Sequence, residues 1–97
     1  MKYIGVLRKI DKLGRLVLVK EFRDYLNIDS NEVVYIYLDK NHLLISNKIL
    51  EDKKLLSLRK IDKLGRLCLP KKYIPQDFFS DEYAQKLTEN WIELESI

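Results

Sequence analysis

The sequence predicts a mainly β fold with short helices, built from two tandem units that each run strand–strand–helix–strand–strand. Three observations support this prediction. The ten residues LRKIDKLGRL at positions 7–16 return unchanged at positions 58–67. Apolar and polar residues alternate over several segments, as in strands that bury one face. Each repeat also carries one glycine, Gly14 or Gly65, where we expect the chain to turn.

The repeat extends over most of the chain, because residues 31–46 also align with residues 80–95. A unit of about 45 residues is close to the size below which a core is too small for independent folding. We therefore expect a first unit (residues 1–48) and a second, degenerate unit (56–97), joined by a linker (49–55), to pack as one body.

Local patterns define the elements of the first unit. Runs rich in β-branched and aromatic residues predict strands, and Phe22, Tyr25 and Leu26 are spaced for one face of a short helix. The expected elements are a strand at Tyr3–Asp11, a turn at Lys12–Gly14, a strand at Arg15–Val19, a helix at Lys20–Leu26 and strands at Glu32–Leu38 and His42–Ser46.

The second unit repeats this order with a weaker helix. Pro70 suits the first position of a helix, but Pro75 interrupts it after about one turn. Ile92 and Leu94 are expected to face the core. The expected strands are Leu56–Asp62, Arg66–Leu69, Tyr83–Leu87 and Trp91–Glu95.

Composition excludes several classes of protein. No apolar run is long enough to span a bilayer, and the N-terminus lacks a secretory pattern. The single cysteine, Cys68, allows no internal disulfide and fits the cytoplasm, where we expect this protein. The sequence has no Cys/His metal spacing, no nucleophile–base pattern and no nucleotide loop. We therefore expect no enzyme, cofactor or metal site.

Several conspicuous side chains receive a structural interpretation. Cys68 aligns with a valine, so we expect it to be small and buried. For Tyr35 and Tyr37, which share a strand face, packing against the helix is preferred over stacking on bases. We place His42 in a hairpin turn, where a role as ligand or base is not preferred. We place Glu93 and Glu95 on a solvated strand edge.

Charge is sorted along the chain. Residues 8–23 contain six basic and two acidic residues, and residues 59–72 contain six basic and one acidic. Residues 73–97 contain one basic and six acidic residues. Because the basic blocks coincide with the closest repeat, they indicate two related cationic surfaces. An ordinary solvated surface is the alternative interpretation.

The arginines of these blocks suit binding to duplex DNA. Arg8 and Arg59 lie on expected strands, whereas Arg15 and Arg66 directly follow the glycine turns. Guanidinium groups on rigid elements neutralise phosphates and can bind guanine edges, and two related sets match the twofold character of a duplex. The alternative is a surface ion pair with the aspartate four residues earlier. We assign those aspartates chiefly to shaping the turns.

The stretch GVLRKIDKLGRLVLVKEFRDYLNI resembles the N-terminal DNA-binding domain of the AbrB/SpoVT family of bacterial transcriptional regulators. The shared pattern is G-hydrophobic-hydrophobic-R-K-hydrophobic-D-x-L-G-R, then a hydrophobic strand and a helix with an arginine. The resemblance covers residues 1–47, returns over 56–72 and continues weakly over 73–97. It implies a swapped-hairpin β-barrel in which two copies interleave their strands. A single-chain pseudo-dimer or a homo-oligomer is then expected.

The resemblance also implies contacts with double-stranded DNA from basic residues of both units. Asp24 stands where the family often has a second basic residue, and the second unit lacks the helix arginine. The expected DNA-binding residues are Arg8, Lys9, Lys12, Arg15, Arg23, Arg59, Lys60, Lys63, Arg66, Lys71 and Lys72.

Three functions remain in competition. The leading hypothesis is a cytoplasmic transcriptional regulator that occupies promoter DNA. The second is an antitoxin related to the MazE branch, although such antitoxins usually add a long flexible tail where this chain has another copy. The third is an interaction or scaffold module without DNA binding, which Asp24 and the acidic residues 73–97 favour.

Overall fold

The computed structural model describes residues 5–70 and 82–96. The described part is mainly β, as predicted, with a single short helix. Its elements are β1 (Val6–Lys9), β2 (Arg15–Val17), α1 (Lys20–Tyr25), β3 (Val33–Asp39), β4 (His42–Ser46), β5 (Lys54–Lys60), β6 (Arg66–Cys68), β7 (Glu82–Leu87) and β8 (Ile92–Ser96). The predicted second helix falls on residues 71–81, outside the described residues.

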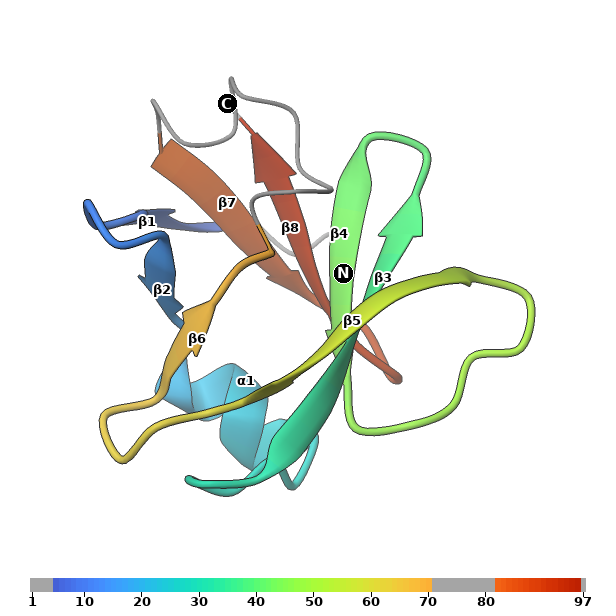
Figure 1. Ribbon diagram of the computed structural model, residues 1–97, viewed down its shortest axis with the longest axis horizontal. Helices are drawn as coiled ribbons and strands as arrows, with labels where there is room; N and C mark the ends of the chain where they lie inside the picture. Colours follow the sequence, from blue (N-terminus) through green and yellow to red (C-terminus); the bar gives the residue numbers. More distant parts are fainter. Residues whose placement is uncertain (1–4, 71–81, 97) are drawn as a thin grey trace.

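The strands form one large sheet and one small ribbon (Figure 1). Six strands pair antiparallel in the order β1–β7–β8–β4–β3–β5, and β2 pairs only with β6. The sheet therefore has two edges, β1 and β5, and the described strands do not close into a barrel. The predicted barrel is wrong in this respect, because β2 and β6 are only three residues long and leave the edges of the larger sheet unjoined.

Most strand pairing joins the two halves of the chain. β1 pairs with β7, β5 with β3, β2 with β6 and β4 with β8. The registers are equivalent. Val6 lies opposite Gln85 and Ser57 opposite Ile36, and these pairs are related by the spacings of 51 and 49 seen in the sequence repeat. Each half thus supplies a first strand to the sheet of the other half.

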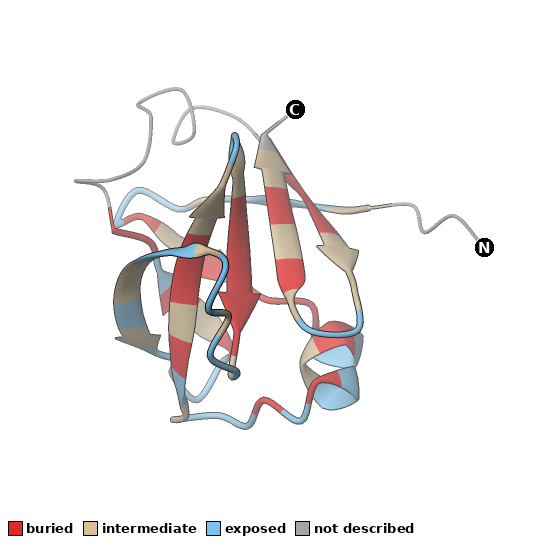
Figure 2. Cartoon of the chain, turned by 90° about the vertical axis from the view of Figure 1, so that its right-hand side faces the viewer, coloured by how far each residue is buried: buried red, intermediate tan, exposed pale blue. Residues whose placement is uncertain are grey.

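A single hydrophobic core lies between the ribbon, the helix and the large sheet (Figure 2). Leu16 and Leu67 lie opposite each other in the ribbon, and both are fully buried. The helix contributes Phe22, and β8 contributes Ile92 and Leu94, which face inward as predicted. Full burial of one such side chain contributes roughly 1.5–3 kcal/mol, so the short ribbon is held to the sheet mainly through its two leucines.

The helix α1 is held by tertiary contacts at its start. Val19 at the N-cap has no side chain that could bond the free N–H groups, and Asn27 ends the segment with a φ of 57°. The fully buried Gln85 accepts a hydrogen bond from the Val19 N–H (2.9 Å) and donates one to the Val17 carbonyl (2.8 Å). This amide therefore joins β7 to the segment between the ribbon and the helix.

Both faces of β3 are covered at its centre. Ile36 and Tyr37 are neighbours on the strand and point to opposite faces of the sheet, yet both side chains are buried. The register with β5 shifts between them, with Leu56 of β5 as the extra residue. Tyr37 is expected to pack against the helix, whereas its hydroxyl group donates to the Lys48 carbonyl and accepts from the Leu50 N–H, both at 3.0 Å. Tyr37 therefore anchors the segment that follows β4.

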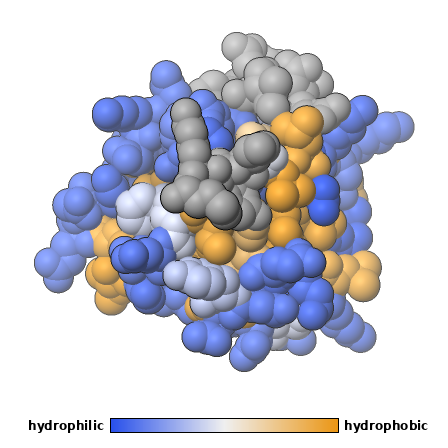
Figure 3. Space-filling model, turned by 180° about the vertical axis from the view of Figure 1, so that it is seen from behind, coloured by the Kyte–Doolittle hydropathy of each residue, from blue (hydrophilic) through white to orange (hydrophobic). Residues whose placement is uncertain are grey.

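The surface combines charged and apolar side chains. Figure 3 shows hydrophobic patches among hydrophilic residues on the side opposite that of Figure 1. Exposed apolar residues include Leu7 on β1, Leu55 and Leu58 on β5 and Val33 on β3. Individual exposed leucines are common in soluble proteins, and these residues do not define a site by themselves.

Candidate nucleic-acid interface

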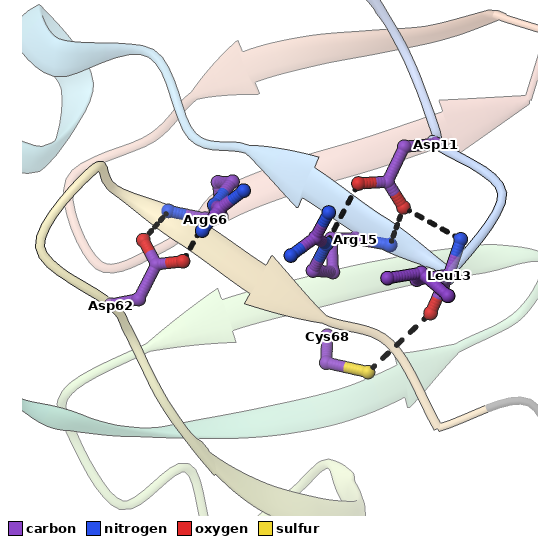
Figure 4. A network of polar contacts seen from close by, with 6 residues as sticks. All are labelled: Asp11, Leu13, Arg15, Asp62, Arg66 and Cys68. Carbon is purple, nitrogen blue, oxygen red and sulfur yellow. Dashed lines mark hydrogen bonds and ion pairs between the residues drawn. The ribbon is translucent and has the colours of Figure 1, made fainter.

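The first repeat folds into a compact turn held by one carboxylate (Figure 4). Asp11 Oδ1 accepts hydrogen bonds from the backbone N–H groups of Leu13 and Arg15, both at 2.9 Å. Its Oδ2 accepts a third from Arg15 Nε at 2.7 Å. Gly14 has a φ of 79°, which favours glycine. One aspartate therefore fixes the backbone of the turn and also orients the guanidinium group.

The second repeat folds in the same way. Asp62 accepts hydrogen bonds from the N–H groups of Leu64 and Arg66 at 2.9 Å and from Arg66 Nε at 2.6 Å, and Gly65 again has a φ of 79°. The backbone N–H of Arg66 is the main cause that lowers the pKa of Asp62, and the guanidinium group adds to this effect. The expected turn-shaping role of the aspartates is confirmed.

Arg15 and Arg66 lie on the same face of the β2–β6 ribbon. Arg15 is opposite Cys68, and Arg66 is opposite Val17. Directly opposite residues share a face, and the leucines of the other face are buried, so this face points to solvent. The two arginines are diagonal neighbours, with Cα atoms roughly 7–8 Å apart, and their side chains are 33% and 31% exposed. The ribbon thus presents two guanidinium groups side by side.

Backbone hydrogen bonds hold the two turns together. The Leu18 N–H donates to the Gly65 carbonyl at 3.0 Å, and the Leu69 N–H donates to the Gly14 carbonyl at 2.9 Å. The two bonds are equivalent, because Leu18 and Gly14 correspond to Leu69 and Gly65 at the repeat spacing of 51 residues. Each turn is therefore fixed by the strand of the other half, so both basic turns belong to one rigid unit.

Six of the other predicted basic residues lie on the strands and turns that adjoin the ribbon. Arg8 and Lys9 lie on the edge strand β1, and Arg59 and Lys60 lie on the edge strand β5. These strands lead directly into the two turns. Lys12 and Lys63 lie in the two turns, and both are exposed. Lys71 and Lys72 lie outside the described residues. Whether any of these side chains contacts DNA stays a prediction.

Arg23 lies between the two halves. Its Nε donates to the Leu18 carbonyl at 3.1 Å. Its guanidinium group covers Gly65, since a Cβ atom built on Gly65 would lie 2.5 Å from Nη2 and 2.9 Å from Nη1. The arginine of the first-half helix therefore lies against the turn of the second half, a contact that the sequence does not predict.

Cys68 is exposed, which corrects the expectation of a buried side chain. It lies on the ribbon face shared with the two arginines, and its Sγ is 3.9 Å from the Leu13 carbonyl oxygen. Its aligned partner Val17 is also exposed. The alignment correctly makes the two residues equivalent, but a strand of three residues does not reveal which face is buried.

A second group of charged residues lies on the large sheet. His42 Nδ1 is 3.2 Å from Glu93, His42 Nε2 is 3.6 Å from Glu95, and Lys86 donates to Glu95 at 2.7 Å. The predicted solvated edge is wrong, because β8 lies between β7 and β4 inside the sheet. Within the described ranges, no group of three or more His, Cys, Asp and Glu residues is arranged to hold a metal ion.

Comparison with known proteins gives one informative similarity. The chain is 38% identical over 45 residues to the transition state regulatory protein AbrB of Bacillus subtilis (strain 168). The match covers 46% of this chain and 47% of AbrB, so the chain spans about half the length of the curated relative it matches. No family model matches the chain, and no solved structure matches it. The similarity supports an AbrB-like relationship at this coarse level.

The described part of the chain contains no helix long and apolar enough to cross a membrane.

Proposed function

We propose that this chain is a DNA-binding transcriptional regulator of the AbrB/SpoVT type, which binds duplex DNA through the exposed face of the β2–β6 ribbon. One observation carries the proposal. Arg15 and Arg66 lie diagonally on that face, and each is oriented by an aspartate bonded to its Nε. Among the described residues the Nη donors of both arginines have no partner, and they can bind phosphate oxygens or guanine edges. A two-stranded ribbon is also an element that fits the major groove, which is about 12 Å wide.

The charge distribution supports the same surface. Residues 8–15 and residues 59–66 each contain four basic residues and one aspartate, so each segment has a net charge of +3. Because the whole chain also has a net charge of +3, its other residues together carry −3. Positive charge is therefore concentrated in the two turn segments. Such a surface attracts a polyanion and loses affinity as salt rises.

The two halves are best explained as two copies of one unit that exchange strands within one chain. The equivalent registers between the halves support this arrangement, and so do the equivalent backbone bonds from Leu18 to Gly65 and from Leu69 to Gly14. In this proposal the chain acts as a single-chain pseudo-dimer in the cytoplasm, and its two turns meet the two halves of a DNA site.

Duplex binding at several salt concentrations tests the proposal. The measurement is fluorescence anisotropy of a labelled duplex, from about 50 to 200 mM salt. The double variant Arg15→Ala/Arg66→Ala should lose about 2 kcal/mol or more, roughly a 30-fold weaker Kd. Its salt slope should fall by about 2 when both arginines bind phosphates, whereas the loss of base contacts would weaken binding without changing the slope.

A matched control removes the same charge elsewhere. Lys40 in the β3–β4 turn and Lys54 at the start of β5 are exposed, and both segments lie on the side of the molecule away from the β2–β6 ribbon (Figure 1). Lys40→Asn/Lys54→Ala should change the Kd by no more than about 2-fold, since asparagine tolerates the φ of 57° at position 40. Equal weakening by the two double variants would show that net charge and not the ribbon governs binding. No binding to any duplex at low salt would refute the proposal.

A further inference from the structure

The two basic turns differ in their contact with the helix arginine, although their backbones and carboxylates match. The guanidinium group of Arg23 lies on the turn around Gly65. No arginine follows Arg66 in the sequence, so the second half has no guanidinium group with which to repeat this contact on Gly14. The pseudo-symmetry of the chain is therefore broken at a turn next to the surface that the proposed function assigns to DNA.

Arg23 adds a cationic donor to the second turn. Within the described ranges it forms no ion pair and donates through Nε alone. Its Nη groups lie beside the turn that carries Lys63 and Arg66. A phosphate bound beside this turn can accept hydrogen bonds from the Nη groups of Arg23 as well as from Arg66. Arg23 is therefore a phosphate-binding group that the first half supplies to the second turn.

The centre of the ribbon is also unequal. On the exposed face, Arg15 is paired with Cys68 and Arg66 with Val17. The Cys68 Sγ lies near the Leu13 carbonyl. The equivalent residue in the other strand, Val17, has no polar side-chain atom that could contact the Leu64 carbonyl. A DNA site that meets this face therefore meets different chemistry on its two sides.

We propose that the chain binds duplex DNA in one orientation, with the Arg23-backed turn always on the same half of a non-palindromic site. This inference rests on the proposed DNA-binding function. A symmetric homodimer has two identical turns and cannot distinguish the two directions of its site. A single chain with one Arg23 can do so, through the extra contact at the turn around Gly65.

Tethered cleavage of DNA tests the orientation. Leu13 and Leu64 lie at equivalent positions of the two turns and are 63% and 66% exposed, so Leu13→Cys and Leu64→Cys provide matched attachment points. Both are made in a Cys68→Val chain, which leaves one thiol for an iron–EDTA reagent. The duplex is one enriched from a random library by the wild-type chain. We expect the probe at position 13 to cleave one flank of the site and the probe at position 64 to cleave the other, each by at least about 10:1.

Arg23→Ala identifies the cause of the orientation. This variant should bind the enriched duplex about 5- to 10-fold more weakly, and in its background the cleavage ratio should fall towards 1:1. Lys20→Ala, on the same helix, is the matched control and should leave the ratio unchanged and the affinity within about 2-fold. A thermal melt of each variant verifies that it is folded.

The outcomes separate the two proposals. If the library yields no bound duplex at low salt, DNA binding fails, and the orientation proposal fails with it. If duplexes are enriched but each probe cleaves both flanks equally, the chain binds DNA without a fixed orientation and only the further inference is overturned. One-sided cleavage that persists in Arg23→Ala overturns the assignment to Arg23.

Discussion

Replacing Gly65 with alanine tests the contact between the halves, and its cost can be worked from the geometry. At a φ of 79°, a side chain with a Cβ costs about 1–2 kcal/mol. The new Cβ would lie 2.5–2.9 Å from atoms of the Arg23 guanidinium group, so that group must move. The movement breaks its hydrogen bond to the Leu18 carbonyl, which contributes about 0.5–1.5 kcal/mol. Gly65→Ala should therefore destabilise the fold by about 2–3 kcal/mol.

A double-mutant cycle separates the two contributions. In an Arg23→Ala background the guanidinium group is absent, so Gly65→Ala should cost only the backbone term of about 1–2 kcal/mol. The assay is equilibrium unfolding in urea, followed by the fluorescence of Trp91, the single tryptophan. The four chains of the cycle are compared at one pH and salt concentration.

The reasoning would be refuted by equal costs of Gly65→Ala in the two backgrounds, within about 0.5 kcal/mol. That result would mean that Arg23 does not lie on Gly65 in solution, and the basis for a single DNA orientation would be lost. A cost near zero in both backgrounds would show in addition that position 65 does not hold its positive φ.

Three further predictions concern other parts of the molecule. The pKa of Asp11 and Asp62 is lowered in the folded state, so their contribution to stability is present above pH 3.8 and lost below it. Asp11→Asn/Asp62→Asn should therefore flatten the fall in Tm on acidification. An unchanged dependence of Tm on pH would contradict this prediction. Gln85→Leu leaves the buried Val19 N–H without its acceptor and should cost about 1–3 kcal/mol in a thermal melt, whereas an unchanged Tm would dismiss the role of the amide. Cys68 should react with a thiol reagent without denaturant, and protection until unfolding would show that it is buried.

The sequence predicts local structure here better than it predicts which segments meet. The aspartate–glycine–arginine spacing is sufficient to predict both turns, because the contacts that shape them span only four residues. The inward positions of Ile92 and Leu94 follow from simple alternation. Cys68 is misplaced because three-residue strands carry too little pattern to identify the buried face.

Contacts between the halves need information that a repeat does not contain. Gln85 has no conspicuous neighbours in the sequence, yet its amide joins β7 to the start of α1 over a separation of 66 residues. The contact of Arg23 with Gly65 is equally long-range. A clue was present in the composition, since the second half lacks an arginine equivalent to Arg23. That difference predicts unequal halves, although it does not identify Gly65 as the partner.

Two similar turns within one chain can also differ from each other. Two separate chains with the same sequence must present identical turns, and any substitution alters both at once. In this chain each turn accepts a backbone hydrogen bond from the segment that follows the ribbon strand of the other half, so the two turns are held in one unit. The surrounding residues can nevertheless differ, as Val17 and Cys68 do. The shared backbone keeps the spacing of Arg15 and Arg66 fixed, whereas Arg23 acts on one turn only. A rigid pair of contacts with unequal surroundings is the physical requirement for reading a DNA site in one direction.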